Sequence, residues 1–241
     1  MDSRDNILSI NDLHVSYPHH RDTLRGVTFS IKRGSIVSVV GSNGAGKTTL
    51  LNTISGIIRY DGGKITGGEI NFKGKRIDNL KPVQIIREGI VHILEGRREF
   101  SSLTIEENLC LGSLTRSGSP TKRGIEMVYS YFPSLFPKKK TLAADCGPGE
   151  LQMLAIGRAL MAQPELILLD EPYQRISPVL AGDLFSAISQ INKEEAIAFI
   201  FVERAPCMSF QVTDDVLGIS DGMIFRPDKG MINSSGLSAR S

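Results

Sequence analysis

The sequence predicts an α/β fold with a parallel β-sheet at its core, and three observations support this prediction. Short aliphatic runs alternate along the chain with segments of helical periodicity, a pattern that predicts a parallel sheet with right-handed crossovers. One of these runs, residues 36–40, is nearly all apolar, which is typical of a strand buried on both faces. The chain has 241 residues, of which 41% are hydrophobic, so one large domain with a substantial core is expected.

In the first half of the chain, predicted strands lead into a glycine-rich turn and a helix. Alternation of apolar and polar residues predicts the first two strands, and a turn around residues 17–20 separates them. The elements expected here are strands 7–15 and 27–31, the buried strand 36–40, the turn 41–46, a helix 47–58, a glycine-rich hairpin region 61–74 with a strand at 69–72, a helix near 83–88 and a strand at 90–94.

The middle of the chain, from residue 105 to about 142, lacks clear strands and is interpreted as a helical insertion. The lysine run 138–140 within it is interpreted as a solvated loop. Apolar residues at helical spacing then predict a helix over residues 153–161. The Ser- and Gly-rich tail, about 228–241, is expected to fray. Between that helix and the tail we expect a strand at 166–169, a helix at 180–191, and strands at 196–202 and 216–219.

Composition and charge exclude several classes of protein. Lys and Arg number 28 and Asp and Glu 26, so the formal net charge of +2 gives no reason to expect a nucleic-acid partner. Cys110, Cys146 and Cys207 have no metal-ligand spacing and are interpreted as reduced thiols. The first residues do not form a signal peptide, and the longest apolar run, 196–202, is far shorter than the ~20 residues of a membrane helix. We therefore expect no direct membrane insertion.

The turn after the buried strand matches the phosphate-binding P-loop pattern, Gly-x4-Gly-Lys-Thr, over residues 41–48. Glycines let consecutive backbone N–H groups surround a phosphate, and the following helix presents the positive end of its dipole to the same anion. Lys47 supplies a compact charge for the β- and γ-phosphates, and the Thr48 hydroxyl can ligate Mg²⁺. The pattern therefore predicts a site for ATP and Mg²⁺. The residues assigned to it are Gly41, Ser42, Asn43, Gly44, Ala45, Gly46, Lys47, Thr48 and Thr49.

A second buried strand should bring a carboxylate to the same site. The aliphatic run 166–169 ends in Asp170 and Glu171. Asp170 is expected to hold Mg²⁺ through water, and Glu171 to take a proton from the attacking water. Lys47 and Glu171 are thus the predicted catalytic residues.

Together, these residues resemble the ATP-binding cassette (ABC) ATPases. The P-loop at 41–48 (Walker A), the segment 152–161 and the stretch 166–171 (Walker B) have the order and spacing of that family. Residues 95–98 (Glu-Gly-Arg-Arg) and 103–109 are similar to the ATP-binding subunits of bacterial branched-chain amino acid importers.

The resemblance covers about residues 7–225 and implies the fold of an ABC-type P-loop NTPase. That fold has a parallel-sheet core, an antiparallel β subdomain and a helical subdomain, here at about 100–160, in a single nucleotide-binding domain over residues 1–241. The resemblance also implies that Tyr17 stacks on adenine. Glu95 would stand where most of the family has a Gln that senses Mg²⁺ and the transporter.

Three departures from the family pattern bear on activity. The family's signature, Ser-Gly-Gly-Glu-Gln, closes over the ATP held by the other subunit of a head-to-tail dimer, and it is replaced here by Gly-Pro-Gly-Glu-Leu at 147–151. Gly147 has no hydroxyl and Pro148 no backbone N–H for the γ-phosphate, and each lost hydrogen bond costs on the order of 1.5–3 kcal/mol. The turn after Walker B, 173–176, has bulky and charged residues where the subunits should meet. Arg204 occupies the switch position, usually His, and can contact the γ-phosphate but cannot accept a hydrogen bond.

The resemblance implies a cytoplasmic ATP-binding subunit, peripheral on the inner face of the cell membrane, that couples ATP binding and hydrolysis to amino-acid import. Its implied partners are membrane permease subunits and a second ATP-binding subunit, in a homodimer or a heterodimer. Two alternatives stay open: a degenerate cassette that binds ATP but hydrolyses it poorly, and a soluble cassette ATPase that works without a permease. The departures at Gly147, Pro148 and Arg204 lead us to expect impaired hydrolysis.

Overall fold

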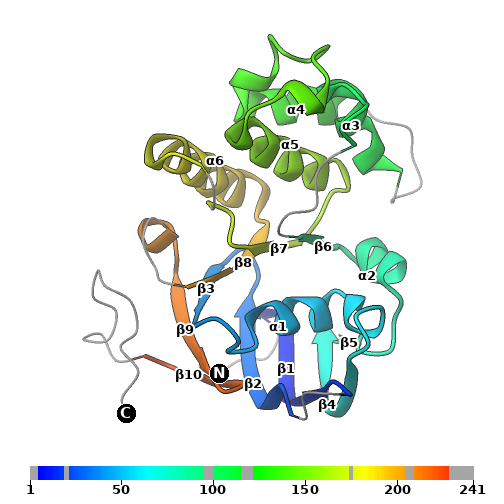
Figure 1. Ribbon diagram of the computed structural model, residues 1–241, viewed down its shortest axis with the longest axis vertical. Helices are drawn as coiled ribbons and strands as arrows, with labels where there is room; N and C mark the ends of the chain where they lie inside the picture. Colours follow the sequence, from blue (N-terminus) through cyan, green and yellow to red (C-terminus); the bar gives the residue numbers. More distant parts are fainter. Residues whose placement is uncertain are drawn as a thin grey trace.

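Two β-sheets form the lower half of the molecule, and a lobe of helices lies above them (Figure 1). The computed structural model describes residues 5–18, 22–94, 100–114, 122–173, 176–204 and 209–227. Strands and helices alternate through most of these residues, and the central sheet is largely parallel. The predicted α/β fold class is therefore confirmed.

The central sheet has six strands in the order β10-β9-β3-β8-β7-β6. Its neighbouring strands pair in parallel except for β10, which pairs antiparallel with β9. Because β3, β8 and β7 lie side by side, their carboxyl ends meet at one edge of the sheet, where P-loop proteins bind ligands. The bounds are β3 Ile36–Val40, β6 Ile90–Ile93, β7 Leu166–Asp170, β8 Ala198–Glu203, β9 Asp215–Ser220 and β10 Met223–Phe225.

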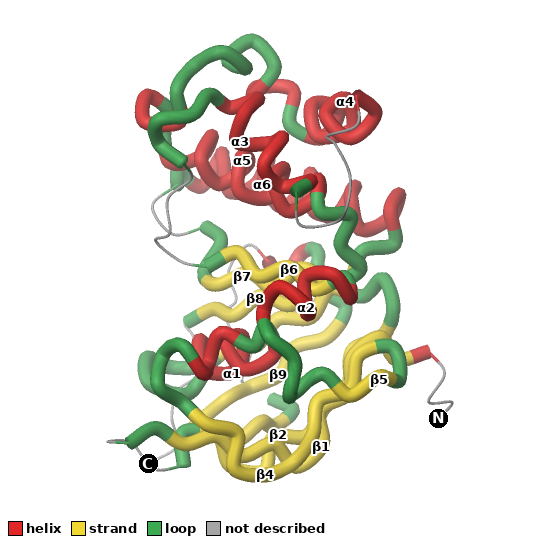
Figure 2. The backbone as a smooth tube through the Cα atoms, turned by 90° about the vertical axis from the view of Figure 1, so that its right-hand side faces the viewer, coloured by secondary structure: helices red, strands yellow, loops and turns green. Residues whose placement is uncertain are grey.

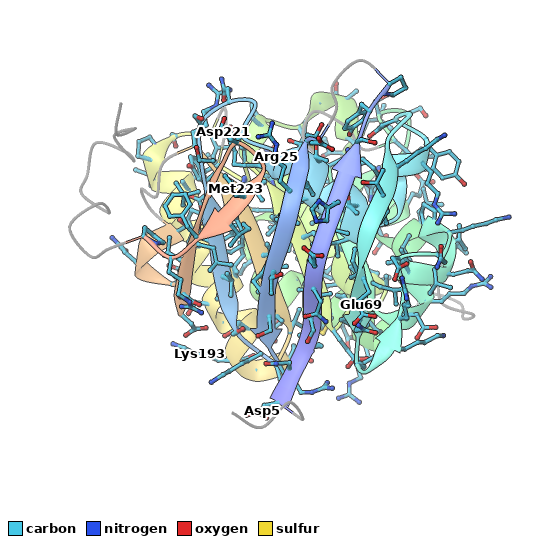
Figure 3. All side chains as sticks on the ribbon, turned by 90° about the horizontal axis from the view of Figure 1, so that it is seen from below. Asp5, Arg25, Glu69, Lys193, Asp221 and Met223 are labelled. Atoms are coloured by element: carbon cyan, nitrogen blue, oxygen red, sulfur yellow. The ribbon has the colours of Figure 1, made fainter. Side chains whose placement is uncertain are left out.

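A second, antiparallel sheet has four strands in the order β2-β1-β4-β5. Seen from below, its outer face carries polar side chains, among them Arg25 of β2 and Glu69 of β4 (Figure 3). The turn between β9 and β10 adjoins this sheet, since the N–H of Arg25 donates to the carbonyl oxygen of Gly222 at 2.8 Å. The bounds are β1 Asn6–Ser16, β2 Leu24–Lys32, β4 Lys64–Phe72 and β5 Lys75–Arg76.

Six α-helices fall within the described residues, and four of them, α3 to α6, gather above the sheets (Figure 2). Helices α3, α4 and α5 lie in the interval where the sequence predicts a helical subdomain. The α-helices are α1 Lys47–Ile54, α2 Pro82–Glu88, α3 Ile105–Ser113, α4 Lys122–Tyr131, α5 Pro148–Met161 and α6 Pro178–Glu195, and short 3₁₀ turns lie at Ile57–Arg59, Pro133–Leu135, Ala143–Asp145 and Ser209–Gln211.

The central sheet separates two hydrophobic cores, and alternate residues of its strands belong to opposite cores. In β7, Leu166 and Leu168 pack with α1 and the antiparallel sheet, whereas Ile167 and Leu169 pack with helices α3 to α6. All four side chains are fully buried. The prediction of strands buried on both faces is therefore confirmed, and α1 lies between the two sheets.

Helix α1 is shorter than predicted. It ends at Ile54 instead of continuing to residue 58, and Ile57–Arg59 forms a separate 3₁₀ turn. The hydroxyl of Ser55 donates to the carbonyl oxygen of Leu51, and Gly56 then takes a left-handed conformation with φ +72°. A left-handed residue stops an α-helix, so the apolar periodicity that continues past it does not extend the helix.

Two further boundaries differ from the prediction. Strand β8 begins at Ala198 instead of residue 196, because Ala196 ends α6 in a left-handed conformation with φ +53°. Strand β4 begins at Lys64 instead of residue 69 and pairs with the distant β1. Gly68 lies where β1 bulges, and a Cβ there would be 2.2 Å from the carbonyl oxygen of Asp12. Gly68 thus allows a close approach of two strands. The turn of the predicted hairpin region lies at residues 73–74, between β4 and its antiparallel neighbour β5.

In the part of the chain that the structure describes, no helix has the length and apolar character needed to cross a membrane. The predicted tail at 228–241 lies outside the described residues.

Candidate nucleotide-binding site

The P-loop connects β3 to α1, and two of its glycines adopt left-handed conformations. Gly44 has φ +78° and Gly46 φ +107°, values that residues with a Cβ rarely adopt. Gly41 is needed for space instead, because a Cβ there would lie 2.3 Å from the carbonyl oxygen of Ile219. Residues 42–44 are exposed, so the tip of the loop faces solvent and is open to a ligand.

Lys47, the first residue of α1, is buried and is held by the P-loop itself. Its Nζ donates to the carbonyl oxygens of Gly41 at 2.7 Å and Ser42 at 2.9 Å. Burial lowers the pKa of Lys47, and the nearby carboxylates of Glu171 and Asp170 act against this shift. A phosphate bound in the loop would exchange two carbonyl contacts for stronger, charge-assisted hydrogen bonds.

Thr48 and Asp170 meet although they come from α1 and β7. The Thr48 hydroxyl donates to Oδ2 of Asp170 at 2.9 Å, and Asp170 is buried. A hydroxyl and a carboxylate are oxygen donors of the kind Mg²⁺ prefers, and Mg²⁺ at phosphate sites takes one or two protein ligands beside water and phosphate. The described residues contain no cluster of three or more His, Cys, Asp or Glu that could hold a metal alone. This pair therefore fits Mg²⁺ that arrives with a nucleotide.

Glu171 follows β7 directly and has the unusual backbone φ of +43°. Its N–H donates to the carbonyl oxygen of Val202 at 3.0 Å, which fastens it to β8. Its carboxylate Oε1 accepts a hydrogen bond from Nε of Arg204 at 3.3 Å. The predicted general base and the predicted switch residue thus form an ion pair, and the Arg204 guanidinium occupies one oxygen of the base.

Glu203 is a carboxyl group that the sequence reasoning missed. It is fully buried at the end of β8, where Oε1 accepts from the Ser38 hydroxyl at 3.3 Å and Oε2 from the Tyr173 hydroxyl at 3.2 Å. Burial raises the pKa of Glu203 to about 7, hydrogen bonds from the Ser209, Tyr173 and Ser38 hydroxyls oppose this shift, and the charge of Glu171 adds to it. The signal available in the sequence was a Glu that ends an otherwise apolar strand, a position also consistent with an ordinary polar strand exit.

Three further residues of the predicted nucleotide site are Tyr17 and Glu95, assigned from the resemblance, and Thr49 of the P-loop pattern. Tyr17 lies just beyond β1, half-buried against the core, and a Cβ on Gly63 would be 3.1 Å from its ring. Thr49 is half-buried in the first turn of α1. Glu95 lies outside the described residues. The stacking of adenine on Tyr17 stays a prediction.

The altered signature forms the start of α5. Gly147 is the N-cap residue, and its N–H donates to Oε2 of Glu150 at 3.0 Å. Pro148 occupies the first helical position, where its fixed φ is favourable but no N–H is available. Lys138 pairs with Glu150 at 2.6 Å, so this part of the predicted solvated lysine run has a partner. Burial opposes ionisation of Glu150, yet the hydrogen bonds from Lys138 and Gly147 lower its pKa overall.

One of the bulky side chains in the turn after Walker B, that of Tyr173, packs inside the chain. The ring of Tyr173 is turned inward and packs against Phe185 of α6, with 6.1 Å between ring centroids. Its hydroxyl reaches the buried Glu203. Residues 174 and 175 lie outside the described residues. The half-buried Tyr173 thus has partners within the chain, and its expected place at a subunit interface stays a prediction.

The P-loop lies at the carboxyl edge of the parallel sheet, and Asp170 lies beside it at the end of β7, two strands from β3. This arrangement defines a P-loop nucleotide-binding protein. The model of the family described as ABC transporter matches residues 24–174, more than half of the chain. The chain therefore belongs to the ABC transporter family.

Comparisons with individual proteins agree with this assignment. The chain is 36% identical over 207 residues to the high-affinity branched-chain amino acid transport ATP-binding protein BraG of Pseudomonas aeruginosa, which covers 86% of each chain. It is 29% identical over 214 residues to the L-cystine transport system ATP-binding protein TcyN of Escherichia coli, which covers 86% of this chain and 84% of TcyN. Among solved structures, the ADP conformation of MJ1267, an ATP-binding cassette of an ABC transporter, matches with a TM-score of 0.81 and 26% identity over 95% of this chain and 96% of that one.

Proposed function

We propose that this chain is the ATP-binding subunit of a bacterial importer of branched-chain amino acids, and that it couples ATP binding and hydrolysis to transport. The observation that supports it best is the convergence of four side chains from the start of α1 and the end of β7. Lys47 lies inside the P-loop, Thr48 is bonded to Asp170, and Glu171 follows within one residue. These are the groups that phosphoryl transfer to water requires.

Each group has a distinct role in the proposed reaction. The P-loop N–H groups and the Lys47 ammonium bind and orient the phosphates, and the start of α1 adds its dipole. Thr48 and Asp170 would hold Mg²⁺, which supplies charge neutralisation at the β- and γ-phosphates when bound. Glu171 orients the attacking water and accepts its proton. Because the Glu171 carboxylate is paired with Arg204, the pair has to loosen before the proton is taken.

A second ATP-binding subunit is proposed to complete the site. The start of α5 would lie over the nucleotide held by that subunit, in the head-to-tail manner of the family. An apolar patch beside it supports a partner there, since Val179 is 75% exposed and Leu180 comes within 2.8 Å of a Cβ built on Gly149. Permease subunits are the further partners proposed, and they would hold the chain on the inner face of the membrane.

The branched-chain substrate is proposed from the similarity to BraG, with which the chain shares the highest identity given above. The cassette itself contacts nucleotide and not the transported molecule, and similar cassettes serve a cystine system. Uptake of radiolabelled leucine and cystine by vesicles that contain the assembled transporter separates the two substrate classes. Leucine uptake supports the proposal, and uptake of cystine alone contradicts it.

Hydrolysis is tested by steady-state phosphate release from the chain assembled with its partner subunits. Glu171→Gln should keep ATP binding and lower kcat on the order of a hundredfold, because the general base is lost. Glu126→Gln on the exposed face of α4 is the matched control and should leave kcat unchanged. If the unaltered chain and Glu171→Gln both release phosphate only at the background rate while ATP still binds, the chain is a degenerate, non-hydrolytic cassette. Equal rates above background would show that Glu171 is not the general base.

The third alternative, a cassette ATPase without a permease, is tested by purification from membranes. Co-purification with a hydrophobic subunit supports the importer. A chain that leaves the membrane fraction fully at moderate salt and carries no such subunit supports the permease-free ATPase.

A further inference from the structure

The turn that follows Asp170 is fastened to the end of β8 at two neighbouring points. At the first, Glu171 bonds to β8 through its N–H and to Arg204 through its carboxylate. At the second, two residues on, the Tyr173 hydroxyl donates to Oε2 of Glu203 at 3.2 Å. The contacts join residues 202–204 at the end of β8 to Glu171 and Tyr173 of the turn. They therefore form a small clamp around the backbone of the predicted general base.

The inner half of this clamp is rigidly supported. Glu203 is 0% exposed, and its Oε1 accepts from the Ser38 hydroxyl of β3 at 3.3 Å. Its backbone carbonyl accepts the N–H of Gly41, the first P-loop residue, at 3.1 Å. One buried residue thus connects the P-loop, its preceding strand and the turn that carries Glu171. The Tyr173 hydroxyl bonds to the side chain of Glu203, whereas the P-loop bonds to its backbone carbonyl, so removal of that hydroxyl leaves the P-loop contact in place.

The tyrosine ring is fixed as well as its hydroxyl. It packs on Phe185 of α6, and Phe185 in turn packs edge-on against Phe201 of β8 with 5.7 Å between centroids. Removing only the hydroxyl would leave this stack in place. The contribution of the hydrogen bond can therefore be separated from the contribution of the ring.

The backbone conformation of Glu171 is one that needs support from its surroundings. A φ of +43° in a residue with a Cβ is disfavoured, and such conformations persist only where the surroundings determine them. The bonds to Val202 and Arg204 act on Glu171 itself, and the Tyr173–Glu203 bond fixes the chain two residues later. Pro172 between them restricts the turn further, since its φ is locked.

We propose that Tyr173 is a positioning residue for ATP hydrolysis: its hydrogen bond to Glu203 holds the turn so that Glu171 keeps the backbone conformation in which its carboxylate faces the phosphate site. This proposal rests on the hydrolytic function proposed above. Tyr173 does not touch the reacting atoms in this role, and it acts only through Glu171.

The first test is Tyr173→Phe in the chain assembled with its partner subunits. The kcat for ATP should fall about five- to tenfold, while the KM for ATP should stay within about twofold because the Lys47 cradle is untouched. Glu203→Gln keeps an oxygen that accepts the Tyr173 hydroxyl and should retain kcat within about twofold. Retained activity in Glu203→Gln, together with lost activity in Tyr173→Phe, identifies the hydrogen bond itself and not the charge.

The matched control is Tyr131→Phe. Tyr131 is also a buried tyrosine whose hydroxyl donates to carboxylates, Glu194 at 2.9 Å and Glu195 at 3.0 Å, but it joins α4 to α6 away from the P-loop. It should lower thermal stability without changing kcat. If Tyr131→Phe lowers kcat as much as Tyr173→Phe, general destabilisation explains both, and the proposal is overturned.

A second readout does not depend on hydrolysis. In Tyr173→Phe the amide hydrogens of residues 171 and 173 should exchange with solvent at least several-fold faster than in the unaltered chain, and Tyr131→Phe should leave them unchanged. Unchanged exchange and unchanged kcat in Tyr173→Phe overturn the positioning role. A chain that hydrolyses no ATP refutes the proposed function instead, and the exchange measurement still decides whether Tyr173 holds the turn.

Discussion

The two places where this chain would meet a nucleotide differ sharply. At the strand ends, the cradle is complete: Lys47 is inside the P-loop, and Thr48 is bonded to Asp170. At the start of α5, Gly147 offers no hydroxyl and its N–H is taken by Glu150, while Pro148 has no N–H at all. The nucleotide site proposed at the P-loop thus has its expected groups, whereas the proposed contact of α5 with a partner's nucleotide lacks two hydrogen-bond donors.

The P-loop region at the strand ends and the start of α5, called here the strand-end half and the α5 half, are stabilised in different ways. The strand-end half is stabilised by the fold itself, because Lys47 and Asp170 are buried and Thr48 of α1 is bonded to Asp170 of β7. The α5 half is an exposed helix end, where Gly at the N-cap and Pro at the first position satisfy the helix without serving a ligand. A substitution there can thus change function and leave the fold intact.

The largest effect is expected from a substitution in the strand-end half, and it concerns the affinity for MgATP. Lys47→Met keeps a side chain of similar length in the buried P-loop but removes the charge, so the affinity for MgATP should fall on the order of a hundredfold or more. Isothermal titration calorimetry measures it. Lys193→Met, at the end of α6, is the control and should bind as the unaltered chain does. Equal affinity in Lys47→Met would remove the basis for the phosphate cradle.

A smaller effect is expected from repair of the incomplete half. The double substitution Gly147→Ser/Pro148→Gly should raise the transport-coupled ATPase rate up to about tenfold by restoring a hydroxyl and an N–H for the γ-phosphate. There is room for the new side chain, since the nearest atom to a Cβ on Gly147 is Oε2 of Glu150 at 3.9 Å.

The control for this repair is Gly147→Ala/Pro148→Gly, which adds the same Cβ without the hydroxyl. The serine variant should exceed the alanine variant in coupled rate, and neither should change ATP affinity of the isolated chain. Equal rates in the two variants would show that the missing hydroxyl is not what limits the α5 half.

The smallest expected effect is on the pH dependence of stability. It is tested on one carboxyl group from each half, Glu203 and Glu150. The pKa of Glu203 is raised to about 7, so the folded chain keeps a proton that the unfolded chain loses near pH 4.5. Its contribution to stability is therefore lost as the pH rises through about 7, by about 1 kcal/mol between pH 6 and pH 8. Glu203→Gln should remove this loss in urea unfolding measured at the two pH values.

Glu150, in the other half, has the opposite sign and serves as the control. Its pKa is lowered by Lys138 and by the Gly147 N–H, against the effect of burial. Its contribution is present above the unfolded pKa and is lost only as the pH falls below it, so Glu150→Gln should change stability equally at pH 6 and pH 8. The effect of Glu203→Gln on the free energy of unfolding should differ between pH 6 and pH 8, and the effect of Glu150→Gln should not. The opposite result for either variant would contradict the pKa shift assigned to that carboxyl group.

The sequence allowed the P-loop and the Asp170–Glu171 strand exit to be located because both depend on local patterns, a glycine motif and an aliphatic run with a polar end. It did not allow the end of α1 to be located, since Gly56 overrides an apolar periodicity that continues past it. Contacts between distant residues were also missed. The Tyr173–Glu203 bond joins positions 30 apart, and neither residue is unusual alone at a strand end.

The resting contacts of Lys47 have a consequence for how the protein assembles. Because the Lys47 ammonium is held by two loop carbonyl oxygens, the P-loop is preorganised, and triphosphate oxygens can replace those carbonyls as its partners without refolding of the loop. We therefore expect the single chain to bind MgATP without its partner subunits. The proposed docking of those subunits would then begin from the nucleotide-bound form.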